Sequence, residues 1–306
     1  MKAKLVSQEP VIIIIILNWN GKKDTLECLQ SLRDLEYSNY ELVVIDQNST
    51  DGSREAIASQ FPEVTLIRND DNLGFATGNN IGIRHAIDGD ADYIALLNND
   101  TTVEPKFLSA LADAARAYPD FDIFGPKIVF DSDPNIIWAA GSRTDWRRGI
   151  CVQRGYREVD RGQYDTNAEV NALTGCAMVI SRKALKAVGL LDSRFFAYYE
   201  EADWCARARK AGFRILYVPA AVVRHKVSST IGPSSPAIAF YMVRNNLLFV
   251  AKNSTGLRRM SLLGRSLCRE ARTVCSGLIK GRRQDAVVRL RAIAAFLFGR
   301  FGKAEV

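Results

Sequence analysis

The amino-acid sequence predicts an α/β fold in which a mostly parallel sheet is flanked by helices. Over residues 1–130, short runs of β-branched residues alternate with helical stretches. Such alternation is typical of parallel strands joined by helices that cover both faces of the sheet. Each run also ends in a polar segment, as expected where an open α/β sheet binds a ligand. With 306 residues, 47% of them apolar, the chain is long enough to bury the core of a large domain.

Four strands and three helices are expected in this region. Isoleucine, valine and leucine dominate the runs that we interpret as strands. These strands are VIIIIIL (11–17), ELVVID (41–46), VTLIR (64–68) and YIALL (93–97), and the helices between them cover 24–35, 53–61 and 74–87.

Polar segments follow the four expected strands. Each one alone is weak support for a site, because loops between strands and helices are polar in any case. Four of them at one edge of a parallel sheet nevertheless predict a binding site there. The segments are NWNG, DQNSTDGS, NDDNLGFATGNN and NNDTT.

A lone carboxylate, Asp100, follows the fourth strand in LLNNDTTVEP (96–105). The tip of a buried strand, where Asp100 lies, is a place where an open α/β sheet binds a metal ion or a phosphate group. The alternative is that Asp100 or Thr101 caps a helix that begins near Glu104 and Pro105. The local sequence leaves both interpretations open.

The positive charge of the chain is concentrated at its C-terminal end. Residues 252–306 contain 13 Lys and Arg against 3 Asp and Glu, a balance of +10 within a total of +7, so residues 1–251 carry −3. Because the arginines alternate with Leu, Val, Ile and Phe, we expect basic amphipathic helices rather than a site for nucleic acid. Such helices bind an anionic membrane surface, or pack on a partner or on their own domain with the arginines in water. We therefore expect an α/β domain at 1–251 and a basic helical tail at 252–306.

The cysteines and the apolar runs indicate in which cellular compartment the protein is expected. The six cysteines form no CxxC pair, which favours free thiols in a reducing cytosol. No apolar run reaches the roughly 18 to 20 residues that a membrane span requires, and the run at 11–17 is too short for a signal peptide. We expect a cytoplasmic protein without a membrane span, on the inner face of the cell membrane if the tail binds lipid.

Several segments together resemble the family 2 glycosyltransferases with the GT-A fold, especially their rhamnosyltransferase-like branch. The resemblance covers residues 11 to about 251, and it is specific because the elements occur in register. They are ILNWNGKKDTLECLQSL, VVIDQNSTDGS, NLGFATGNNIG, LLNNDTTV and the stretch from TGCAMVISRKAL through FFAYYEEADWCARARKAGFRILYVPAAVVRH.

The resemblance implies a pyrimidine nucleotide-sugar donor. It places Asp46 at the N3–H of the base, with Leu17 and Trp19 lining the base pocket; the alternative for Asp46 is a helix cap. The glycines of NLGFATGNNIG are not spaced as GxGxxG, and no P-loop lysine follows, which excludes a Rossmann dehydrogenase and an NTPase. The resemblance places Asn72, Gly74 and Asn79 around the ribose and phosphates of the donor.

The resemblance also implies a divalent cation, Mg²⁺ or Mn²⁺, held by Asp100 between the two phosphates of the donor. One carboxylate suffices if the substrate supplies further oxygen ligands. The chain has Asn98 and Asn99 where many relatives have a first aspartate, so we expect Asn98 to contribute a weaker contact. His225 is a second metal ligand in this interpretation; the alternative is a structural histidine at a strand end.

The catalytic carboxylates are expected in FFAYYEEADWCARARKAG. Inverting transfer needs a base that takes the proton of the acceptor hydroxyl. The resemblance assigns this role to Glu201 and supporting roles to Glu200 and Asp203. The alternative is that the three acids favour a helix N-terminus, where the macrodipole stabilises negative charge. Gly175, in the strand expected at TGCAMVISR, would allow a sugar to approach closely, unless it marks a bulge.

We therefore expect an inverting, metal-dependent glycosyltransferase of envelope glycan synthesis. By resemblance, dTDP-L-rhamnose is the favoured donor and a UDP-sugar the alternative. The expected acceptor is a lipid-linked saccharide. The competing classes are a sugar-1-phosphate nucleotidyltransferase, whose glycine-rich N-terminal loop is lacking, and a non-catalytic module that binds nucleotide sugars or membranes. The sequence leaves the oligomeric state open, including a homo-oligomer.

Overall fold

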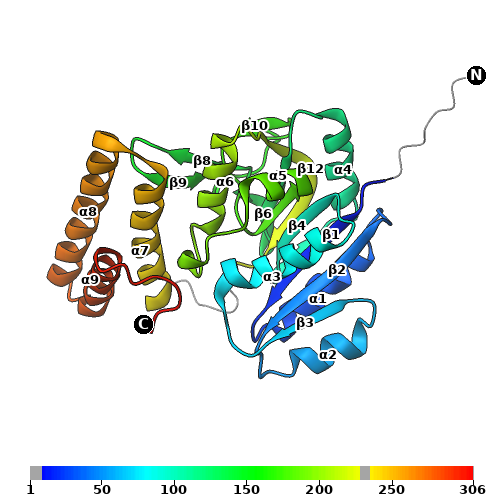
Figure 1. Cartoon of the computed structure of the whole chain (residues 1–306), viewed down its shortest axis with the longest axis horizontal. Helices are drawn as coiled ribbons and strands as arrows, with labels where there is room; N and C mark the ends of the chain where they lie inside the picture. The colour runs from blue at the N-terminus through cyan, green and yellow to red at the C-terminus, as the bar shows by residue number, and fades with distance from the viewer. Residues whose placement is uncertain (1–8, 228–234, 306) are drawn as a thin grey trace, which may run out of the picture.

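The fold is described from a computed structural model covering residues 9–227 and 235–305. A ten-stranded mixed sheet forms its centre, with the strand order β10-β12-β6-β11-β4-β1-β2-β3; β5 pairs with β12, and β7 with β6. Figure 1 shows helices packed against this sheet and the C-terminal helices α8 and α9 on the far side of α7. The expected α/β architecture is confirmed.

The first half of the sheet agrees with the sequence pattern. β1 (Ile12–Asn18) pairs in parallel with both β2 (Tyr40–Gln47) and β4 (Tyr93–Asn98), and β2 pairs in parallel with β3 (Thr65–Asn69). The connecting helices are α1 (Lys22–Arg33), α2 (Ser53–Gln60) and α3 (Gly74–Asp88).

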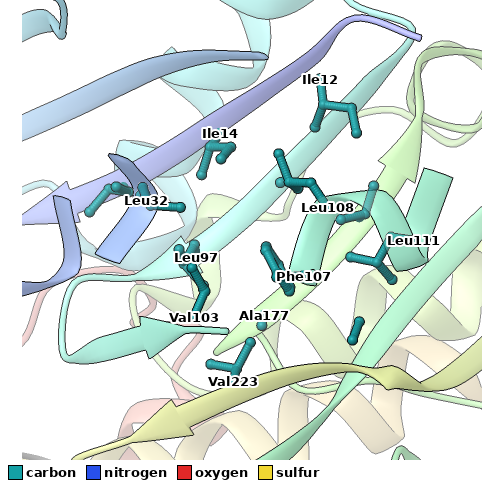
Figure 2. Packing of buried hydrophobic residues seen from close by; sticks show 14 of the residues in the cluster. Ile12, Ile14, Leu32, Leu97, Val103, Phe107, Leu108, Leu111, Ala177 and Val223 are labelled. Atoms are coloured by element: carbon teal, nitrogen blue, oxygen red, sulfur yellow. The ribbon is translucent and has the colours of Figure 1, made fainter. Parts of the chain in front are cut away.

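Burial on both faces explains the run of isoleucines in β1. Ile12, Ile14 and Ile16 belong to one core cluster, and Ile13 and Ile15 belong to another on the opposite face. A strand covered on both faces has no solvent side, so its sequence is apolar without alternation. Figure 2 shows Ile12 and Ile14 in the same cluster as residues of β4 and of α4 (Phe107–Ala117).

A short strand separates Asp100 from the helix that was expected to begin near Glu104 and Pro105. β5 (Thr101–Val103) pairs antiparallel with β12 (Ile215–His225), and Thr101 lies opposite His225. α4 begins later, with Lys106 as its N-cap residue. The interpretation of Asp100 or Thr101 as a helix cap is therefore wrong, because the open edge of β12 takes up residues 101–103 as a strand.

The second half of the sheet mixes strand directions. β6 (Ile123–Phe130) pairs in parallel with β12, whereas β11 (Ala177–Ser181) is antiparallel to β4 and β6. The strand expected at TGCAMVISR thus begins after Gly175, which lies in the preceding loop. The remaining elements of this half are β7 (Asp133–Ala139), β8 (Ser142–Asp145), β9 (Ile150–Gln153), β10 (Ala168–Val170), α5 (Arg182–Val188), η1 (Ser193–Phe195) and α6 (Glu200–Lys210).

Three helices follow the sheet. α7 (Pro236–Asn253) packs through one set of apolar residues on α6 and α8 (Gly256–Ile279) and through another on α9 (Arg283–Leu297). The boundary expected after residue 251 falls in the last turn of α7. In Figure 1 the C-terminal end of the chain returns beside the start of α7. Among the described helices, none combines the length and the apolar content needed to cross a bilayer.

Candidate active site

A cavity of about 950 Å³ opens at the carboxyl ends of β1, β2 and β4. The β3–α3 loop, the segment before β11, the start of α6 and the start of α7 complete its walls. This volume is in the range of sites for small molecules and cofactors. The cavity brings together ten of the thirteen expected site residues: Leu17, Trp19, Asn72, Gly74, Asn98, Asp100, Gly175, Glu200, Glu201 and His225. The structure does not bring Asp46, Asn79 or Asp203 to its surface.

Asp46 lies beneath the cavity in a network of polar side chains. It is fully buried and accepts hydrogen bonds from Asn18 Nδ2 (2.7 Å), from the Ser49 backbone (3.1 Å) and from Arg54. Burial raises the pKa of Asp46, but the hydrogen bonds from Ser49, Arg54 and Asn18 outweigh it and leave the pKa below its ordinary value. In this conformation the carboxylate therefore holds together the loops after β1 and β2. Next to it, Gln47 lines the cavity.

The β3–α3 loop reaches the cavity through Asn72 and Gly74. Asn72 Oδ1 accepts a hydrogen bond from Gly74 N at 2.9 Å. Gly74 has a φ of +80°, and a Cβ there would lie 2.5 Å from the carbonyl oxygen of Phe196, so the position requires glycine. Asn79 lies one turn further along α3, where it is buried and donates to Phe75 O at 3.0 Å.

Asp100 and His225 face each other at the cavity wall. His225 Nε2 lies 3.2 Å from Asp100 Oδ1, and the ring of Trp138 packs edge-on against the imidazole with centroids 4.5 Å apart. Burial opposes the charged imidazolium, but Cys176 and the Asp100 carboxylate raise the pKa of His225 to about 10. The antiparallel pairing of β5 with β12 creates this pair, since it sets Thr101 opposite His225.

These two side chains fit a divalent cation that the substrate helps to bind. Within residues 9–227 and 235–305, no group of three or more His, Cys, Asp or Glu side chains could hold a metal by itself. Mg²⁺ sites commonly use one or two carboxylates together with substrate phosphates and water. His225 Nδ1 is also buried without a hydrogen-bond partner. A cation bound here would displace the imidazolium proton and take its remaining ligands from the substrate.

Glu200 and Glu201 begin α6 and border the cavity. One carboxylate oxygen of each is buried and lacks a hydrogen-bond partner. Burial raises the pKa of both groups above 4.5, and the charge of Glu201 raises that of Glu200 further. Two adjacent buried carboxylates resist carrying two negative charges at once, so the loss of one proton from the pair hinders the loss of the second. The pair thus offers one carboxylate that can act as a base.

Gly175 lies beside this pair. A Cβ at this position would lie 3.1 Å from the ring of Phe75 and 3.6 Å from the Cβ of Glu201. The glycine therefore allows the Phe75 ring to pack closely and leaves room in front of Glu201.

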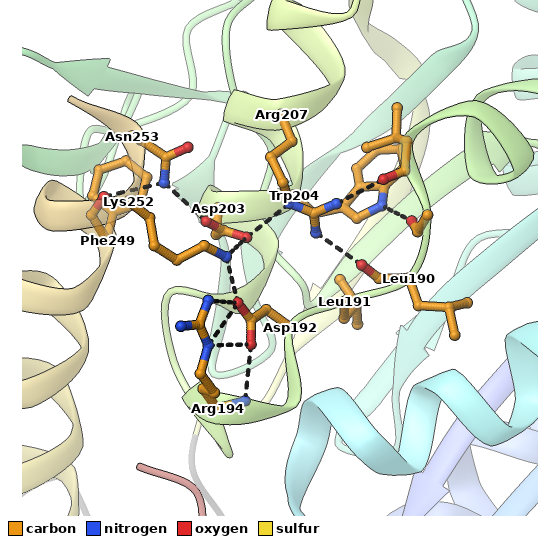
Figure 3. Close-up of polar contacts among 12 residues, drawn as sticks. Leu190, Leu191, Asp192, Arg194, Asp203, Trp204, Arg207, Phe249, Lys252 and Asn253 are labelled. Atoms are coloured by element: carbon orange, nitrogen blue, oxygen red, sulfur yellow. Dashed lines mark hydrogen bonds and ion pairs between the residues drawn. The ribbon is translucent and has the colours of Figure 1, made fainter. Parts of the chain in front are cut away.

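Asp203 also lies in the first turn of α6 but does not line the cavity. It is fully buried and accepts hydrogen bonds from Arg207 Nε (2.9 Å), Lys252 Nζ (2.9 Å) and Asn253 Nδ2 (2.8 Å). Figure 3 shows this carboxylate between α6 and the end of α7, with Lys252 also reaching Asp192. In this conformation Asp203 joins the two helices rather than facing an acceptor.

The backbone just before α6 is strained. Phe196, Tyr198 and Tyr199 have φ values of 61°, 68° and 75°, a left-handed conformation that aromatic residues rarely adopt. The segment bends so that Phe196 O accepts a hydrogen bond from Phe75 N at 2.6 Å. The strain lies directly before the two candidate catalytic carboxylates.

Two buried residues of α7 hold this strained segment, and the sequence analysis missed both. Asn245 Nδ2 lies 2.7, 2.7 and 2.9 Å from the carbonyl oxygens of residues 195, 197 and 198. Arg244 Nη2 lies 3.3 Å from the carbonyl oxygens of residues 194 and 195. A signal was present in AFYMVRNNLLFVA (239–251), where a polar trio interrupts an apolar helix. Buried polar groups of this kind need partners, which the strained segment supplies.

Comparisons with known proteins identify the family of the chain. The sequence profile of "Glycosyl transferase family 2" matches residues 12–189, more than half of the chain. The chain is 28% identical over 267 residues to N-acetylglucosaminyl-diphospho-decaprenol L-rhamnosyltransferase of Mycobacterium tuberculosis, covering 79% of this chain and 86% of that protein. It is 26% identical over 262 residues to dTDP-rhamnosyl transferase RfbF of Shigella flexneri, covering 80% of this chain and 82% of that protein.

Solved structures share the fold. The mannosyltransferase PcManGT of Pyrobaculum calidifontis, in complex with GDP-Man and Mn²⁺, aligns with a TM-score of 0.60 and 15% identity over 96% of this chain and 89% of its own. GalNAc-T7 with UDP, GalNAc and Mn²⁺ aligns with a TM-score of 0.63 and 18% identity over 80% of this chain and 48% of its own. These likenesses confirm the expected GT-A-like fold. The chain therefore belongs to the family 2 glycosyltransferases, is similar to their rhamnosyltransferases, and is a glycosyltransferase.

Proposed function

We propose that the protein is an inverting, metal-dependent rhamnosyltransferase that acts on a lipid-linked saccharide in envelope glycan synthesis. One observation carries the proposal. The Asp100–His225 pair and the Glu200–Glu201 pair border the same cavity, at the strand ends where α/β folds bind ligands.

In the proposed reaction, Glu201 takes the proton of an acceptor hydroxyl as that oxygen bonds to the anomeric carbon of the sugar. The bond between this carbon and the diphosphate oxygen breaks, and the diphosphate leaves with the electron pair. Burial and the charge of Glu201 raise the pKa of Glu200, and a protonated Glu200 would donate a hydrogen bond to a sugar oxygen. The protonated Glu201 is reset when it releases its proton to solvent.

Asp100 and His225 would hold Mg²⁺ or Mn²⁺, with Asn98 on the same cavity wall. When bound, the cation neutralises part of the charge that develops on the leaving diphosphate. Leu17 and Trp19 are apolar surfaces suited to a pyrimidine base. Asp46 is the expected base reader only if its side chain leaves the network beneath the cavity, so we propose that neighbouring Gln47 takes part in this contact.

The donor and acceptor are proposed from the relatives. Their names specify L-rhamnose, dTDP-rhamnose and a decaprenol-linked N-acetylglucosamine. We therefore favour dTDP-L-rhamnose, with a UDP-sugar as the alternative.

A donor screen tests this proposal. Purified protein is incubated with dTDP-rhamnose, UDP-glucose, UDP-N-acetylglucosamine or GDP-mannose, together with a bacterial lipid extract, with Mn²⁺ or with EDTA. We expect nucleoside diphosphate release and labelled lipid product with dTDP-rhamnose and Mn²⁺. A product of retained anomeric configuration, or equal turnover in EDTA, would contradict the proposed mechanism.

We also propose that the C-terminal helices bind the inner face of an anionic membrane. Within the described residues, every large apolar side chain that is more than half exposed lies between Leu257 and Phe298. Ile279 is 86% exposed, and basic residues flank it in IKGRR (279–283). Exposed apolar side chains beside arginines are typical of helices that lie in a membrane interface. Packing on the domain and binding to lipid are thus compatible, because they use different faces of these helices.

Co-sedimentation with vesicles tests the membrane proposal. We expect the wild-type protein to bind phosphatidylglycerol vesicles more tightly than phosphatidylcholine vesicles, and salt to weaken this binding. Ile279→Glu and Leu257→Glu should each weaken binding by roughly 10-fold or more, since each removes an apolar side chain from the lipid and adds a negative charge. Val159→Glu, at a 48% exposed position far from these helices in sequence, is the control. Unchanged binding in both helix variants, with loss of self-association, would assign this surface to a homo-oligomer.

A further inference from the structure

The cavity is poor in positive charge for a ligand with two phosphates. Among the described residues that line it, four are carboxylic acids: Asp71, Asp100, Glu200 and Glu201. Lys303 is the sole Lys or Arg in the same set. A nucleoside diphosphate brings at least two further negative charges, which the enzyme must offset for binding to be favourable. A cationic side chain near the diphosphate would therefore add to the charge that a divalent cation at Asp100 supplies.

The C-terminal segment that carries Lys303 is anchored on both sides of this residue. Gly302 has a φ of +80°; its N–H donates to Arg194 O (2.9 Å), and its carbonyl accepts from Arg244 Nη1 (2.8 Å). On the other side, Ala304 N donates to the hydroxyl of Tyr241 at 2.9 Å. Arg244 and Tyr241 are both buried in α7. The backbone around Lys303 is therefore held by the core of the helical layer, at the edge of the cavity.

The side chain of Lys303 is held only weakly. Its Nζ lies 2.7 and 2.9 Å from the two carboxylate oxygens of Asp71, on the β3–α3 loop. Both side chains are more than half exposed, at 53% and 62%. Exposed pairs of this kind contribute little stability, so a ligand with a higher charge can take over the lysine.

We propose that Lys303 binds the diphosphate of the nucleotide-sugar donor, moving from Asp71 to the phosphate oxygens when the donor enters. The proposal rests on the proposed function, because it assumes a nucleoside diphosphate in the cavity. It gives the C-terminal segment a direct part in donor binding. It also explains how a chain whose first 251 residues carry a net negative charge can bind a polyanion.

The test measures the affinity of dTDP and UDP in the presence of Mn²⁺, by calorimetry, for the full chain and four variants. Lys303→Met should weaken dTDP binding roughly 10-fold, the loss of one charge-assisted contact at a partly exposed site. Lys303→Arg should bind within about 3-fold of the wild-type protein, because it keeps the charge. Lys186→Met, at an exposed lysine of α5, is the control for net charge and should leave the dTDP affinity unchanged.

Asp71→Asn distinguishes a Lys303 that binds phosphate from a Lys303 that matters only through its ion pair with Asp71. If Lys303 binds phosphate, this variant should bind dTDP more tightly than the wild-type protein, because it removes a competing carboxylate and a repulsive charge. If it instead weakens binding as much as Lys303→Met does, the Asp71–Lys303 contact itself matters and the proposal is overturned. Unchanged dTDP affinity in Lys303→Met would also overturn it. A wild-type protein that binds neither dTDP nor UDP would instead refute the proposed function.

Discussion

Replacement of Asn245 by alanine should impair catalysis more than stability. The Asn245 amide satisfies buried carbonyl groups of the strained segment before α6. Its two N–H groups donate to these carbonyls, and each buried bond left unmade costs about 1–3 kcal/mol. The two lost bonds therefore destabilise the folded state by about 2–6 kcal/mol. Without them, Phe196, Tyr198 and Tyr199 can relax from left-handed backbone conformations, which returns about 1 kcal/mol or more.

The net loss in the free energy of unfolding should be about 1–5 kcal/mol. The melting temperature should fall by about 2–4 °C per kcal/mol for a chain of this size. The relaxed segment no longer places Glu201 correctly, and a displacement of about 1 Å can lower kcat roughly 100-fold. We therefore expect a well-folded variant with nearly normal dTDP affinity and a much lower kcat.

The assay measures melting by calorimetry, dTDP affinity, and kcat at a temperature where the variant is fully folded. Asn80→Ala is the matched control. Asn80 is also buried and exchanges two hydrogen bonds with the backbone of Leu191, at 2.8 and 3.0 Å, outside the strained segment. It should lose similar stability and keep kcat within a few-fold. An Asn245→Ala variant with normal kcat, or equal kcat losses in the two variants, would refute this account of how Glu201 is positioned.

Three further predictions concern the acidic residues Glu200, Glu201 and Asp100 of the cavity. Glu201→Gln should keep dTDP binding and lower kcat by roughly 100-fold or more, as expected for a lost general base, in a steady-state assay; full activity in this variant alongside loss in Glu200→Gln would move the base by one residue. Asp100→Asn should abolish transfer at millimolar Mn²⁺ and weaken Mn²⁺ binding measured by electron paramagnetic resonance, and normal activity would remove Asp100 from the metal site. Burial raises the pKa values of Glu200 and Glu201 above 4.5 in the folded protein. As the pH rises, the unfolded chain therefore loses these two protons at a lower pH than the folded protein does. Stability should therefore fall as the pH rises from 4.5 through the raised values, and urea titrations should show a smaller fall in Glu200→Gln.

The local sequence was sufficient to predict the first half of the sheet. The isoleucines of β1 lie in core clusters on both faces of the sheet, and such burial leaves a continuous apolar run that only a central strand explains. Parallel strands then place their carboxyl ends at one edge, so the polar segments that follow were predicted to meet. Most of the expected site residues, including Asp100 and Glu201, do line one cavity there.

Tertiary packing decided the direction of each side chain and the role of residues distant in sequence. Asp46 and Asp203 occupy expected positions in the chain but are buried in polar networks, because partners such as Arg54 and Lys252 come from other elements. Asn245 donates hydrogen bonds to the strained segment before α6, and the periodicity of the sequence does not reveal this contact. Sequence periodicity reports which residues are buried, because burial follows the geometry of a single strand or helix. It does not report which polar groups meet, since those contacts depend on how separate elements pack against one another.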